Sequence, residues 1–328
     1  MIKLNEEVAV PIIVVGSANQ DYIVQMQAPP AVGETILASG LRKQPGGKGA
    51  NQAVAAARLG GQVVFVGCVG DDADGALLLR ELRAEGVDTS EVEVVGREPT
   101  GLALVSVFKN GENSIIVIPG ANFALPSARV SRVVKRVGAA GAVVVVQGEV
   151  APDNIRAALT SAASVRARAI LNLAPFMPLG RELLGLCDPL VVNETEAGAM
   201  VGWAVRGPGD AAQAAIELRE VVRSVVITIG ADGAFWADKD HVGYVPAPLV
   251  EHVVDTTGAG DAFVGVLAAR LAAGASLGDA VEVGVRAGSF AVTRLGAQSS
   301  YPMRADVLPK PTSSVASSTS IIASASEV

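Results

Sequence analysis

One segment of the sequence combines small residues with a carboxylate: DTTGAGDAF, residues 255–263. Strand-like Val253-Val254 precedes it, and an apolar helix-forming stretch follows. The small residues 258–260 allow a tight turn that directs successive N–H groups, and the positive end of the helix, to one point. A carboxylate beside such an anion site is electrostatically unfavourable, so Asp261 is a candidate base that accepts a proton from an attacking hydroxyl. A helix-capping role for Asp261 is the other interpretation that the sequence leaves open.

A second segment, PGGKGANQ at residues 45–52, lies at the predicted start of a helix. Its glycines would let a ligand approach the backbone, and Lys48 and Asn51 offer donors for sugar-like hydroxyls. The segment is not a Walker A loop, because it lacks both the required spacing and a following Ser or Thr. An ordinary glycine-rich turn remains the alternative.

Polar residues also follow the carboxyl ends of two predicted buried strands. Asn19 and Asp21 come after the strand at 10–15, and Glu149 comes after AVVVVQG. Open α/β sheets bind ligands at the carboxyl ends of their strands, so these residues are candidates for contacts to sugar hydroxyls. An Asx-turn would equally explain Asp21. The missing GxGxxG pattern argues against a dinucleotide site.

Two further strand ends have the residue types of a nucleotide and metal site. Asn193 and Glu196 follow the strand at 189–192, where acids suit Mg²⁺ bound through water, although a helix N-terminus favours acids without a metal. Thr228, Gly230 and Gly233 follow the strand at 224–229 and could hold a ribose or phosphate of a nucleotide. An ordinary entry into a hairpin is the alternative there.

Regularly alternating elements must position these residues. From about residue 125, predicted strands at 143–147, 169–173, 189–192 and 224–229 alternate with predicted helices, and a hairpin follows at 233–246. This order is typical of βαβ winding, so the fold class is α/β, with a mostly parallel central sheet flanked by helices on both faces. Further helices are predicted at 49–59, 74–86, 260–273 and 278–294.

Four extended segments lack crossover helices and cannot belong to that parallel sheet. They lie at 22–26, 34–44, 102–109 and 113–118, the last two joined by a favoured Asn110-Gly111 turn. We expect them to form a small β-sheet lid from about 20–45 and 101–119. The predicted organisation is one domain, 1–310, and a disordered Ser/Ala-rich tail, 311–328.

Composition limits the functions that the chain could have. The 328 residues are 50% hydrophobic and 18% charged, which predicts a large core, and the net charge of −7 disfavours nucleic acid as a partner. The apolar runs are too short to span a membrane. Two cysteines without CxxC spacing, and an N-terminus without a cleavage site, indicate a cytoplasmic protein.

Taken together, these segments resemble the ribokinase (PfkB-type) family of sugar kinases. GGKGANQAVAAARLG and DTTGAGDAF look like its two signature regions, and GSANQD, NETE and TIGADG match further family segments in the same order. The resemblance covers roughly residues 9–309. GGKGANQ, the early Asn-x-Asp and VTRLGAQSS are most similar to the kinases that phosphorylate ribose, which implies transfer of a phosphoryl group from ATP to D-ribose.

The resemblance also implies a role for each matching residue. Asp261 would be the catalytic base, beside an anion hole formed by Gly258, Ala259 and Gly260. The sugar would be held by Asn19, Asp21, Gly46, Gly47, Lys48, Asn51 and Glu149 together with Asp261. ATP would contact Asn193, Thr228, Gly230, Gly233 and Gly260. Val285 stands where relatives often have an Asn near the adenine, so no adenine contact is assigned.

The family also implies metal ions and a partner chain. Asn193 and Glu196 would support Mg²⁺ through water. An activating K⁺ would be bound, mostly through backbone carbonyls, by Asp255, Thr257, Ala291, Arg294, Gly296 and Ser300. The lid would close over the sugar and mediate a homodimer.

Three alternatives remain open on the sequence. The first is a family kinase acting on fructose, deoxyribose, a nucleoside or a sugar phosphate; an aromatic content of 4% disfavours a nucleoside, whose base needs a stacking partner. The second is a sugar-binding regulator that has lost activity, which an intact Asp261 argues against. The third, a nicotinamide oxidoreductase, is disfavoured by the missing GxGxxG.

Overall fold

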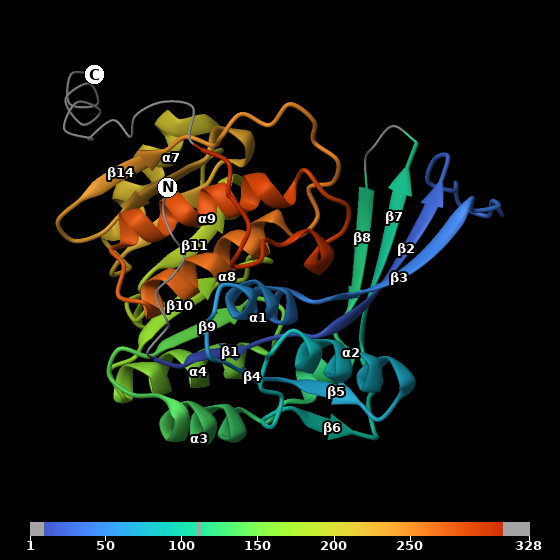
Figure 1. The fold of residues 1–328 in the computed structure, drawn as a ribbon, viewed down its shortest axis with the longest axis horizontal. Coiled ribbons are helices and arrows are strands. Elements are labelled where there is room, and N and C mark those ends of the chain that lie inside the picture. Colours follow the sequence, from blue (N-terminus) through green and yellow to red (C-terminus); the bar gives the residue numbers. More distant parts are fainter. Residues whose placement is uncertain (1–9, 110–112, 311–328) are drawn as a thin grey trace.

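The computed structural model describes residues 10–109 and 113–310 (Figure 1). The predicted Asn110-Gly111 turn and the predicted disordered tail lie outside the described residues.

The core of the fold is an eight-stranded sheet in the order β14-β13-β12-β11-β10-β9-β1-β4. Six neighbouring strands, from β4 to β12, are parallel, and β13 and β14 continue the sheet as an antiparallel hairpin. The mostly parallel sheet is therefore confirmed. The strands are β1 Ile12–Val15, β4 Val63–Val66, β9 Val143–Gln147, β10 Arg168–Asn172, β11 Leu190–Asn193, β12 Val225–Thr228, β13 Ala234–Ala237 and β14 Val242–Val245.

Helices cover both faces of this sheet, which explains why its central strands are mostly apolar. Along β1, Ile12 and Val14 belong to one core cluster, and Ile13 and Val15 belong to the other, as the two-residue period of a strand requires. The first cluster includes residues of α1 Lys48–Arg58, α2 Ala73–Ala84, α8 Ala259–Ala272 and α9 Leu277–Ala291. The second includes residues of α3 Ser127–Val137, α4 Pro152–Ser164, α5 Arg181–Leu184, α6 Glu194–Val201 and α7 Gly207–Arg219.

A separate four-stranded sheet projects from this α/β body (Figure 1). Its order is β3-β2-β7-β8, and its strands are β3 Gly40–Gly46, β2 Asn19–Met26, β7 Gly101–Phe108 and β8 Asn113–Ile118. We call it the lid sheet. Its outer pairs, β2–β3 and β7–β8, are antiparallel, and the central pair β2–β7 is parallel.

Two strand boundaries in the lid sheet differ from the predicted ones. β2 begins at Asn19 instead of residue 22, so Asn19 and Asp21 belong to the strand itself. β3 begins at Gly40 instead of residue 34, because β2 ends at Met26 and offers pairing partners only from Gly40 onward.

Several short elements were not predicted. β5 Cys68–Gly70 and β6 Glu93–Val95 form a two-stranded parallel sheet, and 3₁₀ helices occupy Gly120–Ala124, Gly230–Asp232 and Gln298–Ser300. Segments of three to five residues are too short to show a hydrophobic period.

Candidate active site

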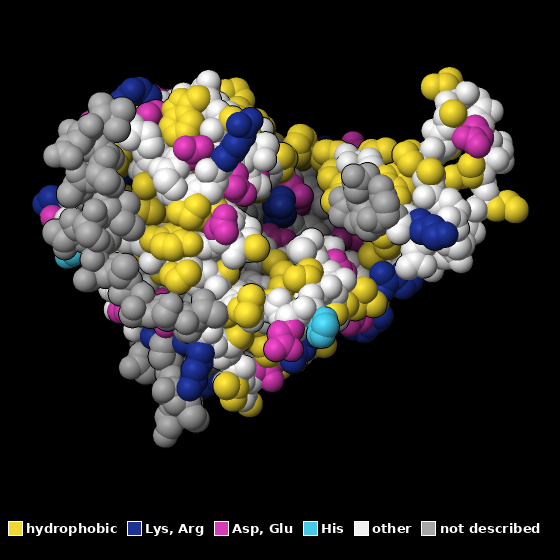
Figure 2. Space-filling model, turned by 90° about the horizontal axis from the view of Figure 1, so that it is seen from above, with side chains coloured by type: hydrophobic (Ala, Val, Ile, Leu, Met, Phe, Trp, Pro, Cys, Tyr) yellow, Lys and Arg dark blue, Asp and Glu magenta, His cyan; other side chains and the backbone are white. Residues whose placement is uncertain are grey.

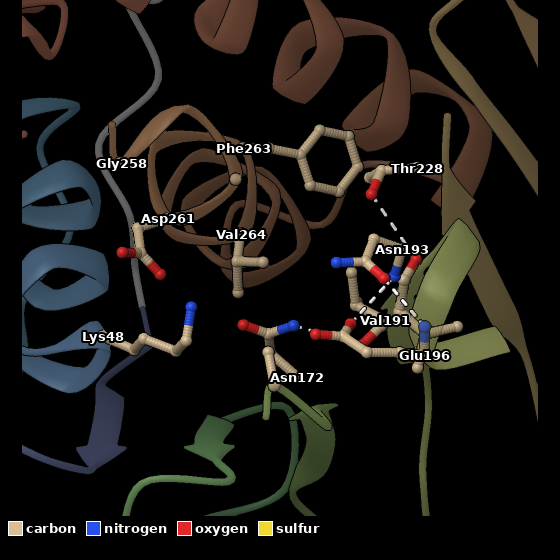
Figure 3. A pocket seen from close by; sticks show the side chains of 13 residues that line it. Lys48, Asn172, Val191, Asn193, Glu196, Thr228, Gly258, Asp261, Phe263 and Val264 are labelled. Atoms are coloured by element: carbon tan, nitrogen blue, oxygen red, sulfur yellow. Dashed lines mark hydrogen bonds between the residues drawn. The ribbon is translucent and has the colours of Figure 1, made fainter. Parts of the chain in front are cut away.

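Several of the predicted site residues gather at the carboxyl edge of the main sheet. Because the six central strands are parallel, their carboxyl ends lie along one edge, and the N-termini of α1 and α8 reach the same place (Figure 1). The molecule is hollowed between the body and the lid sheet, and basic and acidic side chains are visible inside the hollow (Figure 2). A pocket at this edge is lined by Lys48, Asn172, Ala174, Val191, Val192, Asn193, Glu196, Thr228, Gly258, Gly260, Asp261, Phe263 and Val264 (Figure 3).

Asp261 lies in the first turn of α8, next to Gly258 in its left-handed conformation (φ 76°). Its carboxylate is buried and accepts two hydrogen bonds from α1. Asn51 Nδ2 donates to Oδ2 at 2.9 Å, and Gln52 Nε2 donates to Oδ1 at 2.9 Å. The carboxylate thus has a fixed orientation at the pocket wall, beside the positive end of a helix.

The close approach of α1 and α8 brings these three residues together. A Cβ on Gly265 of α8 would lie 2.5 Å from both the Ala55 Cβ and the Gln52 backbone oxygen. Only glycine therefore allows the two helices to pack at this distance.

Gly46 and Gly47, just before α1, lie against Asp21 and Asn19 of β2, which are predicted sugar contacts. A Cβ on Gly46 would lie 2.2 Å from both carboxylate oxygens of Asp21. Gly47 has φ 87°, and a Cβ there would lie 2.7 Å from the Asn19 backbone nitrogen. The glycine-rich segment therefore joins β3 directly to α1 through Gly47, and the missing side chain of Gly46 makes room for Asp21.

Asp21 is buried, and its Oδ1 has no hydrogen-bond partner among the described residues. Burial raises the pKa of Asp21 to about 7, and the negative charges of Glu149 and Asp261 add to the effect. An unpaired buried carboxyl oxygen is an unsatisfied acceptor, which a ligand hydroxyl could bond.

Lys48 extends into this acidic surrounding, between Asp261 and Asn172 (Figure 3). Asp261 raises the pKa of Lys48, and Glu149 and Glu196 do so more weakly, against the lowering effect of burial. Glu149 is fixed from the other side, since its Oε2 accepts from Ser17 Oγ at 2.6 Å and from the Lys48 N–H at 3.0 Å. Lys48 thus stays protonated and offsets the negative charge of the site.

Asn193 and Glu196 cap α6 and also line the pocket. Asn193 Oδ1 accepts from the Glu196 N–H at 2.8 Å, and Glu196 Oε2 accepts from the Asn193 N–H at 2.9 Å, which is a capping box. Burial raises the pKa of Glu196, against the lowering effects of the Asn193 hydrogen bond and Lys48. The capping interpretation is therefore correct, and the two oxygen-bearing side chains still face the pocket.

The predicted nucleotide contacts after β12 lie in two places, the pocket and the turn that follows it. Thr228 ends β12 and lines the pocket, whereas Gly230 and Gly233 lie in the turn that leads to β13 and do not line it. Gly233 has φ 107°, and a Cβ there would lie 2.0 Å from the Val245 oxygen, so this glycine is required by the hairpin.

Comparison with known proteins assigns the chain to a family. A model described as pfkB family carbohydrate kinase matches residues 11–304. The chain belongs to the pfkB family of carbohydrate kinases. This confirms the resemblance derived from the two signature segments.

Relatives of this pfkB-family kinase match it over nearly their whole length. The ribokinase of Haemophilus influenzae is 36% identical over 296 residues, which cover 90% of this chain and 96% of that protein. The deoxyribokinase of Salmonella typhi is 35% identical over 293 residues, which cover 89% and 95%. The structure of Arabidopsis thaliana ribokinase complexed with ribose and ATP has a TM-score of 0.83 and 33% identity, and the match covers 90% of this chain and 96% of that one. The ribokinase-like fold is thereby confirmed.

In this pfkB-family chain, three of the predicted K⁺ positions are joined by hydrogen bonds. Asp255 Oδ1 accepts from the Thr257 N–H and Oδ2 accepts from the Gly296 N–H, both at 2.9 Å. Burial would raise the pKa of Asp255, but these hydrogen bonds outweigh it and lower the pKa. Ala291 and Ser300 bond locally instead: the Ala291 carbonyl accepts from the Arg294 N–H, and Ser300 Oγ donates to the Ala297 carbonyl.

No cluster of three or more His, Cys, Asp or Glu residues suited to a metal ion occurs within residues 10–109 and 113–310.

Several residues at the site were not singled out from the sequence. Asn172 ends β10 and lines the pocket, Phe263 faces Thr228 across it, and Gln52 bonds Asp261 directly (Figure 3). A lone Asn in the apolar run of β10 and a Gln within an Ala-rich helix are the signals that could have identified two of them.

No helix in the described part of the chain is long and apolar enough to cross a membrane.

Proposed function

We propose that this chain is an ATP-dependent ribokinase, which transfers the γ-phosphoryl group of ATP to the primary hydroxyl of D-ribose. The observation that supports this most directly is the buried Asp261 carboxylate, held by two amides at the N-terminus of α8 and open to the pocket. The likeness to ribokinases, one of them complexed with ribose and ATP, supports the substrates.

In the proposed reaction Asp261 accepts the proton of the sugar hydroxyl as its oxygen attacks the γ-phosphorus. The new phosphorus–oxygen bond forms while the bond to the β,γ-bridging oxygen breaks, and its electron pair leaves with ADP. The anion hole would be formed by the backbone of Gly258, Ala259 and Gly260 at the positive end of α8. The Ala259 N–H donates to the Thr256 carbonyl at 3.3 Å in this structure, so it would have to leave this carbonyl to bind the transferring group. Positioning and charge stabilisation therefore account for most of the catalysis.

The sugar would lie between β2, the start of α1 and Asp261. Asp21 and Glu149 accept hydrogen bonds from hydroxyls, and Lys48 and Asn51 donate them. The unpaired Oδ1 of Asp21 supports this assignment. The remaining proposed sugar contacts are Asn19, Gly46 and Gly47.

ATP would extend from the anion hole across the rest of the pocket edge. Its proposed contacts are Asn193, Thr228, Gly230, Gly233 and Gly260. The oxygen donors of Asn193 and Glu196 in the pocket wall fit Mg²⁺ bound through water. When bound, this ion would neutralise charge on the phosphates.

The activating K⁺ would be held near Asp255, Thr257, Ala291, Arg294, Gly296 and Ser300. The lowered pKa of Asp255, whose burial is outweighed by hydrogen bonds from Thr257 and Gly296, keeps a negative charge there, which fits a cation. The ion would stabilise the segment that leads into the anion hole.

The proposal also includes a single domain over residues 1–310 and a cytoplasmic location. The two free cysteines favour that location.

The lid sheet is proposed to close over the sugar and to join two copies of the chain. Residues directly opposite in a sheet share a face. Asp21 and Ala103 are opposite, so their face points toward the site, and the other face contains Leu104 opposite Ile116. That outer face exposes four large apolar side chains: Leu41, Leu104, Ile116 and Ile118. Such an apolar surface, which includes side chains of both edge strands, β3 and β8, favours a protein partner, here a second copy.

ADP production across a panel of sugars tests the proposal. The panel contains ribose, 2-deoxyribose, fructose, a nucleoside and a sugar phosphate, each with and without K⁺, and Asp261→Asn is the matched control. We expect ribose to give the highest kcat/KM, K⁺ to raise the rate, and Asp261→Asn to lower kcat by about 10²–10⁴-fold while ATP still binds.

The other outcomes separate the alternatives. A preference for 2-deoxyribose would indicate a deoxyribokinase, as in the Salmonella typhi relative. Ribose binding without ADP production would indicate a non-catalytic regulator. A rate indifferent to K⁺ would count against the Asp255 site, and a variant Asp261→Asn within tenfold of wild type would exclude Asp261 as the base.

A further inference from the structure

Two layers of buried amides surround the Asp261 carboxylate. The inner layer is Asn51 and Gln52, which donate to its two oxygens. The outer layer is Gln298 and Gln147: Gln298 Nε2 donates to Asn51 Oδ1 at 3.0 Å, and Gln147 Nε2 donates to Gln52 Oε1 at 2.8 Å. All four amides are at least nine-tenths buried.

The direction of these hydrogen bonds is the informative feature. A side-chain amide has nearly the same shape at both ends, but one end donates and the other accepts. Turned by 180°, Asn51 or Gln52 would present an oxygen to the carboxylate and repel it. The outer glutamines prevent this, since each donates to the oxygen of an inner amide and so directs the NH₂ group of that amide toward Asp261.

The inner amide of Gln52 is fixed at its nitrogen as well. Its second N–H donates to Asn172 Oδ1 at 2.9 Å, and Asn172 Nδ2 in turn donates to the Val191 carbonyl at 3.2 Å. The chain of hydrogen bonds therefore ends on the backbone of β11, which has no freedom to turn.

We propose that Gln147 and Gln298 are positioning residues, which fix the Asp261 carboxylate for proton transfer through Gln52 and Asn51. They do not touch the pocket. Gln147 belongs to β9 and Gln298 to the 3₁₀ helix after α9, and both elements contact α1, so two elements distant in sequence determine one carboxylate orientation. This inference rests on the proposed role of Asp261 as the base.

The experiment replaces each outer donor by methionine, which has similar length and volume but cannot donate. We expect Gln147→Met and Gln298→Met each to lower kcat about 10-fold or more, a part of the 10²–10⁴-fold that a general base contributes, while KM for ATP stays within twofold. Introduced into Asp261→Asn, the same substitutions leave the residual rate unchanged within twofold, because no base remains to be positioned.

A matched control separates positioning from stability. Asn154 is a buried amide of α4 that donates to the Leu125 carbonyl, away from the pocket. Asn154→Leu is expected to lower Tm without lowering kcat. Should a methionine variant fail to fold, Gln147→Asn and Gln298→Asn, whose shorter amides do not reach their partners, take its place with the same expected kinetics.

The proposal is overturned if the glutamine variants keep wild-type kcat, or if they lower the residual rate of Asp261→Asn by the same factor as the rate of the wild type. A different failure, in which Asp261→Asn itself retains activity, would contradict the proposed function and is seen before any glutamine is changed.

Discussion

At the scale of single residues, the two carboxylates of the site differ in their surroundings. Asp261 has a hydrogen bond to each oxygen, whereas Asp21 has an oxygen without a partner among the described residues and a pKa raised to about 7 by burial and nearby acids. A general base must be oriented, and a carboxyl that binds hydroxyls must have free acceptors. The surroundings fit these two separate roles.

The raised pKa of Asp21 predicts pH-dependent sugar binding. Hydroxyl donors bind the ionised carboxyl better, so below pH 7 sugar binding must first displace a proton. We expect the Kd for ribose, measured by calorimetry, to rise by up to about tenfold per pH unit below 7 and to be constant above pH 8. Asp21→Asn should bind more weakly with a flat profile, and a flat profile in the wild type would contradict the prediction.

The raised pKa of Asp21 also makes the free energy of unfolding depend on pH. Between about pH 4 and 7 the native state keeps a proton on Asp21 that the unfolded chain has lost. The contribution of this proton to stability is therefore fully present at low pH and is lost as the pH rises through 7. In urea titrations, Asp21→Asn should gain stability relative to wild type as the pH is raised from 5 to 8. An unchanged difference would contradict it.

Tyr301 predicts a second effect on stability. Its hydroxyl is buried and has no hydrogen-bond partner among the described residues. Since an unpaired buried hydroxyl costs about 1–3 kcal/mol, Tyr301→Phe should raise the free energy of unfolding, by on the order of 1 kcal/mol. Urea denaturation measures this, and a loss of stability would mean that the hydroxyl has a partner in solution.

At the scale of elements, the contact between α1 and α8 determines the site. α1 supplies Asn51 and Gln52, and α8 supplies Asp261, so the spacing of the two helices sets the hydrogen-bond lengths. Gly265 permits this spacing, because any side chain there would meet Ala55 and the Gln52 backbone.

We therefore expect Gly265→Val to separate the helices. It should destabilise the protein by about 1–3 kcal/mol through overpacking and lower kcat as well, because Asp261 moves away from its amides. Gly209→Ala in α7 is the matched control, since a Cβ there meets nothing within 4 Å. Thermal unfolding and kcat measured on both variants test this; equal kcat in both would refute it.

At the scale of the whole molecule, the two faces of the lid sheet differ in what they present. Its inner face carries Asp21 toward the site, and its outer face exposes Leu104 and Ile116. A folded monomer rarely leaves such a surface uncovered, so under the proposed function the same four strands would serve both dimer formation and enclosure of the sugar.

Replacement of an outer-face side chain should therefore disrupt the proposed dimer. Ile116→Lys places a charge on the apolar outer face, opposite Leu104, and is expected to convert a dimer into a monomer, because burial of an unpaired charge is strongly unfavourable. Light scattering during size-exclusion chromatography measures the mass. Arg132→Ala, at an exposed position of α3, is a control that should leave the mass unchanged, and a monomeric wild type would contradict the prediction.

Local residue patterns were sufficient to predict most of the architecture. The alternation of apolar strands with helices predicted the parallel sheet, since each strand must be covered on both faces. The predicted start of β3 was misplaced, and the two-stranded sheet of β5 and β6 was not predicted. Pairing partners distant in sequence determine where such strands begin.

By itself, the sequence determined the family, the candidate base and the strand ends that line the pocket, because their residue types and spacing are local signals. Only the tertiary structure decided how Asp261 is held. Its amide partners lie 210 and 209 residues away, and Gln298 lies 247 residues from Asn51. No local pattern marks a glutamine as a donor to a particular amide; its partner is set by the packing of α1, α8, β9 and the segment after α9.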